Sequence, residues 1–142
     1  MFAALPLLAL PVLAYNLIAL TLAGGFSSVE ANIRMAEPLF SFAMTSKVDW
    51  PVNLGDVLLA AGLIVLFIEL LKSTTSRRTA IVNHALSMLL FVICLVEFLL
   101  ASAFATSTFF LITLMVLLDV LAGFIVTVVT ARRDVDFGVN EG

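Results

Sequence analysis

The chain has 142 residues, of which 63% are apolar and 12% are charged, and its mean hydropathy is +1.21. Soluble domains are about half apolar and about a quarter charged, so this composition predicts an integral membrane protein and excludes a soluble enzyme or a disordered chain. Seven basic residues against ten acidic ones give a net charge of −3, which provides no basic surface for a nucleic acid.

Four apolar stretches are long enough to cross a membrane as helices: residues 2–23, 52–71, 79–101 and 108–131. A helix of roughly 20 residues, rising about 1.5 Å per residue, crosses about 30 Å of hydrocarbon. The stretches lack the alternation of barrel strands, so each is predicted to be an α-helix. The expected fold is all-α, a single membrane domain over residues 1–142 built as an antiparallel bundle of four transmembrane helices.

The first stretch is expected to remain in the protein as a membrane helix. No basic residue precedes its apolar run, and that run is longer than the core of a usual signal peptide. Pro6 and Pro11 lie in its first half, where they remove backbone donors and are expected to kink the helix.

The basic residues predict the orientation, because such charges in short loops are retained on the cytoplasmic side. Five of the seven lie between the second and third stretches or directly after the fourth: Lys72, Arg77, Arg78, Arg132 and Arg133. Both termini are therefore expected to be cytoplasmic, with residues 132–142 as a polar tail, in a bacterial inner membrane or a plasma membrane. The third and fourth helices are expected to form a tight hairpin around residues 102–107.

The first outer loop is predicted to contain a short amphipathic helix within residues 27–45. Ser27 and Glu30 have the spacing of a capping box, in which each side chain covers an exposed amide at a helix start. Val29, Ile33, Ala36 and Phe40 then recur at helical spacing, so these apolar side chains are expected to face the membrane or the bundle. The helix would be a lid or docking surface, or an ordinary helix packed on lipid.

Two further residues of this loop have predicted positions. Pro38 is expected to bend or end the amphipathic helix, so that residues 39–44 dip into the interface. Trp50 is expected to be an interfacial anchor, because indole prefers the headgroup level of a membrane.

The chain lacks the residues that most enzymes and cofactor sites require. Cys94 is the single cysteine and His84 the single histidine, which excludes an internal disulfide, a cysteine cluster and bis-histidine haem within one chain. The sequence has no phosphate loop, nucleophile motif or dinucleotide fingerprint. We therefore expect neither catalysis nor a bound metal or cofactor.

Polar residues at membrane depth are the remaining candidates for a functional site, because they are costly in hydrocarbon and usually face the bundle interior or water. In the third helix, Asn83, Ser87, Leu90, Cys94 and Glu97 fall within about 40° of one line at about 100° per residue. They predict a semi-polar seam, with His84 at its flank.

The second helix carries Glu69 on a stripe with Gly55 and Gly62, whose lack of a side chain allows a neighbouring helix to approach. Glu69 is expected to reach the cytoplasmic surface or to pair with Lys72 or Arg78; a hydrogen-bonded pair with His84 is the alternative.

Asp119 lies near the middle of the fourth helix, roughly 18 Å from either membrane surface. It is expected to face the bundle interior or a subunit interface, to be protonated at neutral pH, and to hydrogen-bond Ser87, Asn83 or a backbone carbonyl. It is either a structural pin or a proton carrier.

These features predict a small structural or accessory subunit that packs against lipid and against other membrane subunits or copies of itself. The alternative is a proton- or ion-coupled transporter or channel that uses Asp119. In size and helix count the chain resembles the small multidrug-resistance transporters, whose buried acidic residue lies in the first helix. The first stretch here has no charged residue, so no residue is carried over from that family.

Overall fold

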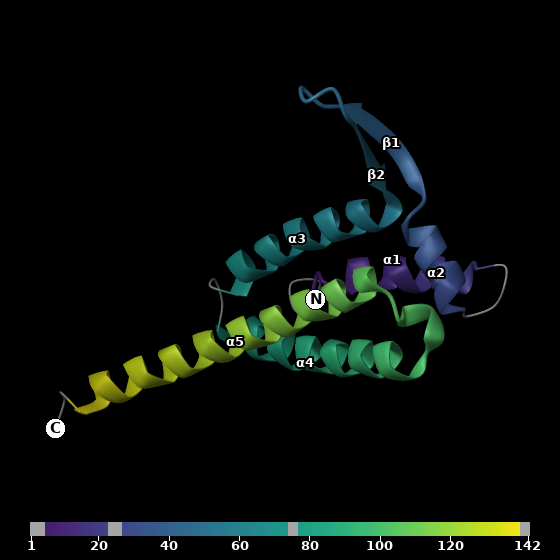
Figure 1. Cartoon of the computed structure of the whole chain (residues 1–142). Helices are drawn as coiled ribbons and strands as arrows, with labels where there is room; N and C mark the ends of the chain where they lie inside the picture. The colour runs from purple at the N-terminus through teal and green to yellow at the C-terminus, as the bar shows by residue number, and fades with distance from the viewer. Residues whose placement is uncertain (1–4, 23–26, 74–76, 140–142) are drawn as a thin grey trace.

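The computed structural model describes residues 5–22, 27–73 and 77–139, with the backbone alone for residues 73, 77–80, 127 and 130–139. The elements in chain order are helices α1 (Ala9–Leu20) and α2 (Ser28–Met35), strands β1 (Pro38–Ala43) and β2 (Asp49–Asn53), helices α3 (Leu54–Ser73) and α4 (Arg77–Leu100), the 3-10 helix η2 (Ser102–Phe104) and helix α5 (Ser107–Val139). Figure 1 shows the long helices running side by side and the two strands standing out to one side.

Within the described residues, three helices are long and apolar enough to cross a membrane: Leu54–Lys72, Ile81–Leu100 and Ser107–Val126. They match the last three predicted stretches. Helix α5 packs against both α3 and α4, and η2 lies in the short α4–α5 connection, as expected for the hairpin around residues 102–107. Small residues allow close contact, as predicted: a methyl group at Gly55 would lie 2.7 Å from Thr108 Oγ1, and one at Gly62 would lie 2.9 Å from Met115 Sδ.

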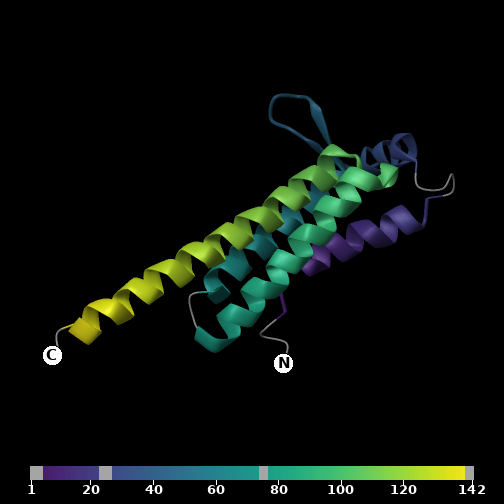
Figure 2. The ribbon, with the colours of Figure 1, turned by 90° about the horizontal axis from the view of Figure 1, so that it is seen from below.

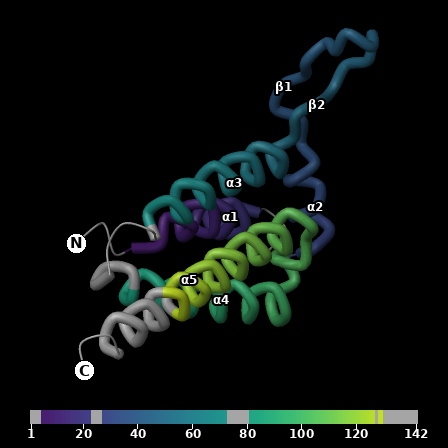
Figure 3. Tube along the Cα trace, turned by 90° about the vertical axis from the view of Figure 1, so that its left-hand side faces the viewer, coloured from purple at the N-terminus to yellow at the C-terminus, as the bar shows by residue number. Residues whose placement is uncertain are grey.

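Helix α1 is shorter than the predicted stretch. It has 12 residues, about 18 Å of helix, and the predicted ends Phe2 and Ala23 lie outside the described residues. The expected kink is wrong, because Pro6 precedes the helix and Pro11 occupies its first turn, where a missing N–H leaves no hydrogen bond unmade. The helix packs along α3 and α5, and Figure 3 shows it beside α3.

Helix α5 is longer than predicted. The expected polar tail is helical as far as Val139, so α5 runs well past the other helices (Figure 2). No glycine or proline interrupts residues 124–137, which leaves the helix without a stop signal there.

Helix α2 begins after Ser27, as predicted, but Ser27 makes no side-chain capping hydrogen bond. A capping contact of this kind occurs instead at the start of α3. There the Asp56 Oδ2 atom accepts a hydrogen bond from the backbone amide of Asn53, three residues earlier, at 3.0 Å. Helix α2 buries Ala31 and Met35. Val29 and Ile33 are 68% and 67% exposed, so they do not face the bundle; the other alternative, that they face the membrane, stays a prediction. The small side chain of Ala31 faces the bundle instead.

Residues 38–53 form an antiparallel β-hairpin where the sequence predicted helix and interface segments. Phe42 pairs with Trp50 and Phe40 with Val52. The turn is held by a hydrogen bond from Lys47 N to Met44 O at 2.9 Å, and Lys47 adopts a φ of 63°. This is the geometry of a three-residue hairpin loop, a type I turn followed by a left-handed residue.

Candidate functional site

The predicted seam of α4 faces the interior. Asn83, Ser87 and Cys94 are 6%, 1% and 0% exposed, respectively. Glu97 and Leu90 are partly buried. Helical spacing therefore predicted correctly which side of α4 packs against the other helices.

Glu69 is the centre of one buried cluster, which we call the Glu69 cluster: Glu69, Lys72 and Asn83. The Glu69 side chain is fully buried. Its Oε2 accepts a hydrogen bond from the backbone amide of Leu7 at 2.8 Å. Its Oε1 accepts one from Asn83 Nδ2 and lies 3.4 Å from Lys72 Nζ. The carboxylate thus joins the segment before α1 to both α3 and α4.

Lys72 completes this cluster as its cation. Its Nζ donates to the carbonyl oxygen of Leu5 at 2.7 Å and lies 3.5 Å from Asn83 Oδ1. The predicted pairing of Glu69 with Lys72 is present, and the Arg78 side chain lies outside the described residues. The alternative prediction was a hydrogen bond between Glu69 and His84. In the structure the side-chain amide of Asn83 makes the hydrogen bond to Glu69 from α4.

Asp119 forms the second buried contact. It is 5% exposed, and its Oδ2 accepts a hydrogen bond from Ser87 Oγ at 2.6 Å. The predicted interior position and the predicted Ser87 partner are both present. This contact, the Asp119–Ser87 pair, joins the middle of α5 to α4.

His84 lies against α5 instead of against Glu69. A methyl group at Gly123 would come within 2.5 Å of His84 Nδ1, so glycine makes the space that the ring occupies. The Nδ1 atom is buried and has no hydrogen-bond partner among the described residues. Asn83, which contacts Glu69, and Ser87, which contacts Asp119, are one turn apart on α4. The two buried contacts therefore lie on neighbouring turns of the same face of α4.

Glu97 contacts α1. Asn16 Nδ2 lies 3.3 Å from Glu97 Oε2 and also donates to the carbonyl oxygen of Val12 at 3.1 Å. This contact ties α1 to α4 and leaves Glu97 apart from the Glu69 cluster.

The sequence did not predict a further set of buried contacts, which we call the Tyr15 cluster: Tyr15, Thr106, Phe104 and Phe109. Tyr15 is 1% exposed, and its hydroxyl donates to the carbonyl oxygen of Ala103 at 2.9 Å and lies 2.6 Å from Thr106 Oγ1. Thr106 Oγ1 in turn accepts the Phe109 amide at 3.1 Å, which caps the start of α5. The available signal was that Tyr15 is the single tyrosine, in an otherwise apolar stretch.

Trp50 is 51% exposed on β2. The centroid of its ring lies 6.4 Å from the ring centroid of Phe42, which in turn lies 5.3 Å from the ring centroid of Phe40. The expected anchor thus belongs to an aromatic row on the hairpin.

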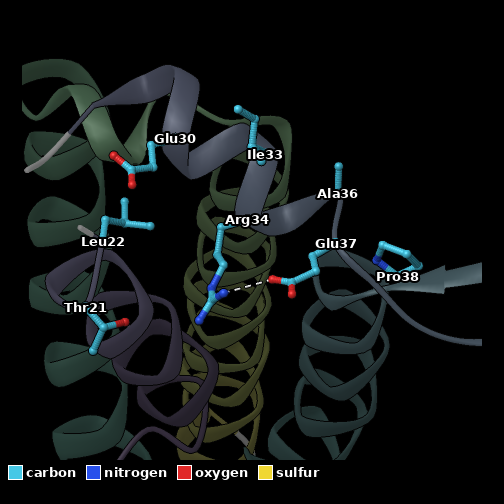
Figure 4. Close-up of a pocket in the computed structure, with 8 residues that line it drawn as sticks. All are labelled: Thr21, Leu22, Glu30, Ile33, Arg34, Ala36, Glu37 and Pro38. Atoms are coloured by element: carbon cyan, nitrogen blue, oxygen red, sulfur yellow. Dashed lines mark hydrogen bonds and ion pairs between the residues drawn. The ribbon is translucent and has the colours of Figure 1, made fainter. Parts of the chain in front are cut away.

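A pocket of about 760 Å³ opens between the end of α1 and helix α2. Figure 4 shows its lining, in which Arg34 reaches Glu37 while Ile33 points away from that ion pair. The Arg34–Glu37 distance is 2.9 Å, and both side chains are about half exposed. The pocket lies beyond the C-terminal end of α1, whereas the Glu69 cluster lies before its N-terminal end, so the pocket does not join the buried acids.

Among the described residues, no group of three or more His, Cys, Asp or Glu side chains has an arrangement that could hold a metal ion. Comparisons with protein-family models, curated proteins and solved structures found no match.

Proposed function

We propose that this chain is an integral membrane accessory subunit whose buried polar contacts hold its helices together while its outer apolar faces pack against lipid and other membrane subunits. The observation that carries the proposal is the distribution of polar and apolar side chains. The interior holds Glu69, Asn83, Ser87 and Asp119, whereas the outward faces of the long helices are apolar. A soluble protein buries most of its large apolar side chains away from water, whereas a protein that faces lipid exposes them on its outer surface.

Exposed apolar side chains lie along α1 and along each of the three long helices α3, α4 and α5. Representative ones are Leu13 and Leu17 of α1, Ile64 and Phe67 of α3, Leu89 and Leu99 of α4, and Phe124 and Ile125 of α5, each between 56% and 67% exposed. Hydrocarbon surrounds such residues without cost. This supports membrane insertion of α3, α4 and α5.

We propose α1 as the core of the fourth crossing. Its 12 residues are about 18 Å long, and apolar residues flank it in the sequence from Phe2 to Ala23. The hydrogen bond from Leu7 to Glu69 satisfies a backbone amide ahead of the helix, as non-helical backbone at membrane depth requires.

The arrangement also supports cytoplasmic termini. The start of α1, the end of α3, the start of α4 and the far end of α5 lie toward the same end of the bundle (Figure 2). The sequence places Lys72, Arg77, Arg78, Arg132 and Arg133 at that end, which the positive-inside rule assigns to the cytoplasm.

An accessory role fits the buried acids better than a transport role does. Glu69 and Asp119 already have partners within this chain, so they need neither substrate nor water to satisfy them. Buried polar groups of this kind join helices in membrane proteins.

A proton-coupled transporter is the second candidate, and one observation favours it. His84 lies against Gly123, one turn from the buried Asp119 on α5, and its Nδ1 has no hydrogen-bond partner in the part of the chain that the structure describes. Buried acid and imidazole groups at membrane depth are typical of proton relays.

Two experiments on the full chain decide between these functions. Crosslinking in native membranes, followed by purification and mass spectrometry, should recover a reproducible partner subunit or a discrete homo-oligomer if the accessory role is correct. Recovery of the monomer alone, together with pH-gradient-driven flux in liposomes that D119N abolishes, would overturn the accessory role and establish transport.

A further inference from the structure

The β-hairpin has two chemically different faces. The pairing of Phe42 with Trp50 and of Phe40 with Val52 puts these four apolar side chains on one face, because alternate residues of a strand share a face. The opposite face carries the pairs Ser41 with Pro51 and Ala43 with Asp49, none of which has a large apolar side chain. The hairpin is therefore amphipathic with the period of a strand.

The aromatic face is turned toward the body of the protein. Val52 belongs to this face and is 7% exposed, whereas Trp50, one pair further out, is 51% exposed. The aromatic face therefore continues outward from a buried position at the base of the hairpin. Figures 1 and 3 show the hairpin at the N-terminal end of α3, standing out away from α4 and α5. The three aromatic side chains of this face are each about half exposed: Phe40 at 48%, Phe42 at 54% and Trp50 at 51%.

We infer that the β1–β2 hairpin lies along the membrane surface beside α3, with Phe40, Phe42 and Trp50 inserted at the boundary between lipid headgroups and acyl chains. This inference rests on the proposed membrane insertion of α3. The hairpin ends at Asn53, directly before the apolar span that begins at Leu54. Its base is thereby fixed at the level where that span leaves the hydrocarbon.

The backbone of the hairpin also favours a lipid headgroup layer. Each strand of a two-stranded sheet has one edge of unpaired amide and carbonyl groups, and such groups are not tolerated facing hydrocarbon. At the headgroup level these edges reach water while the aromatic rings meet acyl chains, the depth that tryptophan prefers. Lys47 at the exposed turn provides a positive charge for lipid phosphate, and Asp49 lies on the opposite, polar face.

The chain contains one tryptophan, so the fluorescence of Trp50 reports the environment of the hairpin directly. The full chain is reconstituted into phosphatidylcholine vesicles that contain lipids brominated at shallow or deep acyl positions, with acrylamide as the aqueous quencher. The matched control is the double variant S41W/W50F, which moves the single tryptophan to the polar face one position along the hairpin. Circular dichroism verifies that the helix content of both proteins is the same.

We expect blue-shifted Trp50 emission, stronger quenching by shallow than by deep bromines, and several-fold stronger bromine quenching for Trp50 than for the control tryptophan. Equal quenching of the two positions, or Trp50 emission that is water-like and fully accessible to acrylamide, would overturn the inference. Protection of Trp50 from both bromine and acrylamide would also overturn it, because a protein would then cover the face. Flotation with the vesicles and resistance to alkaline extraction test helix insertion separately, so failure of the hairpin inference is distinguishable from failure of the proposed function.

Discussion

Different kinds of side-chain contact hold α1 at the two ends of the helix bundle. At the end where α3 stops, the charged Glu69 cluster holds the backbone ahead of α1 through the Leu7 amide and the Leu5 carbonyl. At the end where α5 begins, the uncharged Tyr15 cluster holds α1 through one phenol hydroxyl. The short helix α1 is thus attached by an ion pair and backbone hydrogen bonds at one end, and at the other by a neutral hydroxyl together with the Asn16–Glu97 hydrogen bond.

The two ends are therefore expected to differ in how much free energy is lost when their contacts are broken. A buried ion pair is costly to break, because the remaining partner is left charged and unpaired. A hydrogen bond from a neutral hydroxyl contributes modestly to the stability of a membrane bundle. The aromatic ring of a tyrosine also continues to pack after its hydroxyl is removed. We therefore expect the Glu69 end to dominate stability. The first, third and fourth predictions below test that ranking, and the second tests packing along α3.

The largest effect is expected for E69A. The change leaves the Leu7 amide, the Asn83 amide and the Lys72 ammonium without their shared acceptor. Loss of one partner of a buried pair costs about 3–5 kcal/mol, and we expect about 3 because the Lys72 side chain is 25% exposed and regains water. Reversible unfolding in mixed detergent micelles measures the free energy of unfolding.

The control for this change is E69Q, which keeps a carbonyl acceptor and removes the charge. It should lose clearly less stability than E69A. If E69A costs no more than a substitution at the outward-facing Ile64, which is 62% exposed, the charged end does not dominate.

The charged end was also the more predictable one. Glu69 and Lys72 are one turn apart on one helix, so spacing alone indicated their contact, and the seam containing Asn83 and Ser87 followed from the same periodicity. The Tyr15 cluster depends on how α1 meets the α4–α5 connection. The spacing within any single helix carries no information on that contact.

The errors in the first loop have a physical origin too. Val29, Ile33 and Phe40 fit a helical stripe, yet Phe40 pairs within a strand. The hairpin turn contains no glycine or asparagine between Met44 and Val48, so the usual turn signal is missing. Lys47 takes the left-handed position instead. Similarly, Gly123 makes room for His84 from another helix, which the sequence of α4 alone does not reveal.

The second prediction compares two glycines along α3, one near the Tyr15 end and one nearer the middle. In G55A the new methyl group meets Thr108 Oγ1 and, at 3.1 Å, the backbone carbonyl of Met35, which cannot rotate away. Overpacking of this kind costs about 1–3 kcal/mol. In G62A the methyl group meets the flexible Met115 sulfur at 2.9 Å, so a much smaller loss is expected in the same unfolding measurement. Equal losses would show that rigidity of the neighbour does not decide the cost.

The third prediction removes the hydroxyl of the Tyr15 cluster. Y15F keeps the ring contacts with Phe104 and Phe109 and deletes the bonds to Ala103 and Thr106. Side-chain hydrogen bonds between membrane helices contribute about 0.6 kcal/mol on average and at most about 1.7, so we expect a loss of about 1 kcal/mol. T106V and the double variant Y15F/T106V give the coupling energy between the two hydroxyls. A loss for Y15F that equals that of E69A would reverse the ranking of the two ends.

The smallest effect is expected for D119N, at the Asp119–Ser87 pair between the two ends. Asparagine retains a carbonyl oxygen that accepts from Ser87 Oγ, so a structural pin loses less than about 1 kcal/mol, within the range of membrane hydrogen bonds. D119L is the matched comparison, because it removes the acceptor and leaves the buried Ser87 hydroxyl unsatisfied, and it should lose more stability than D119N. If D119N instead destabilises the protein as much as E69A does, the Asp119 carboxyl group contributes as much to stability as the Glu69 carboxylate, and the ranking that puts the Glu69 end first is wrong. If D119N leaves unfolding unchanged but abolishes pH-driven flux in liposomes, Asp119 is a proton carrier, and the polar contacts of α4 and α5 serve transport in addition to holding the helices together.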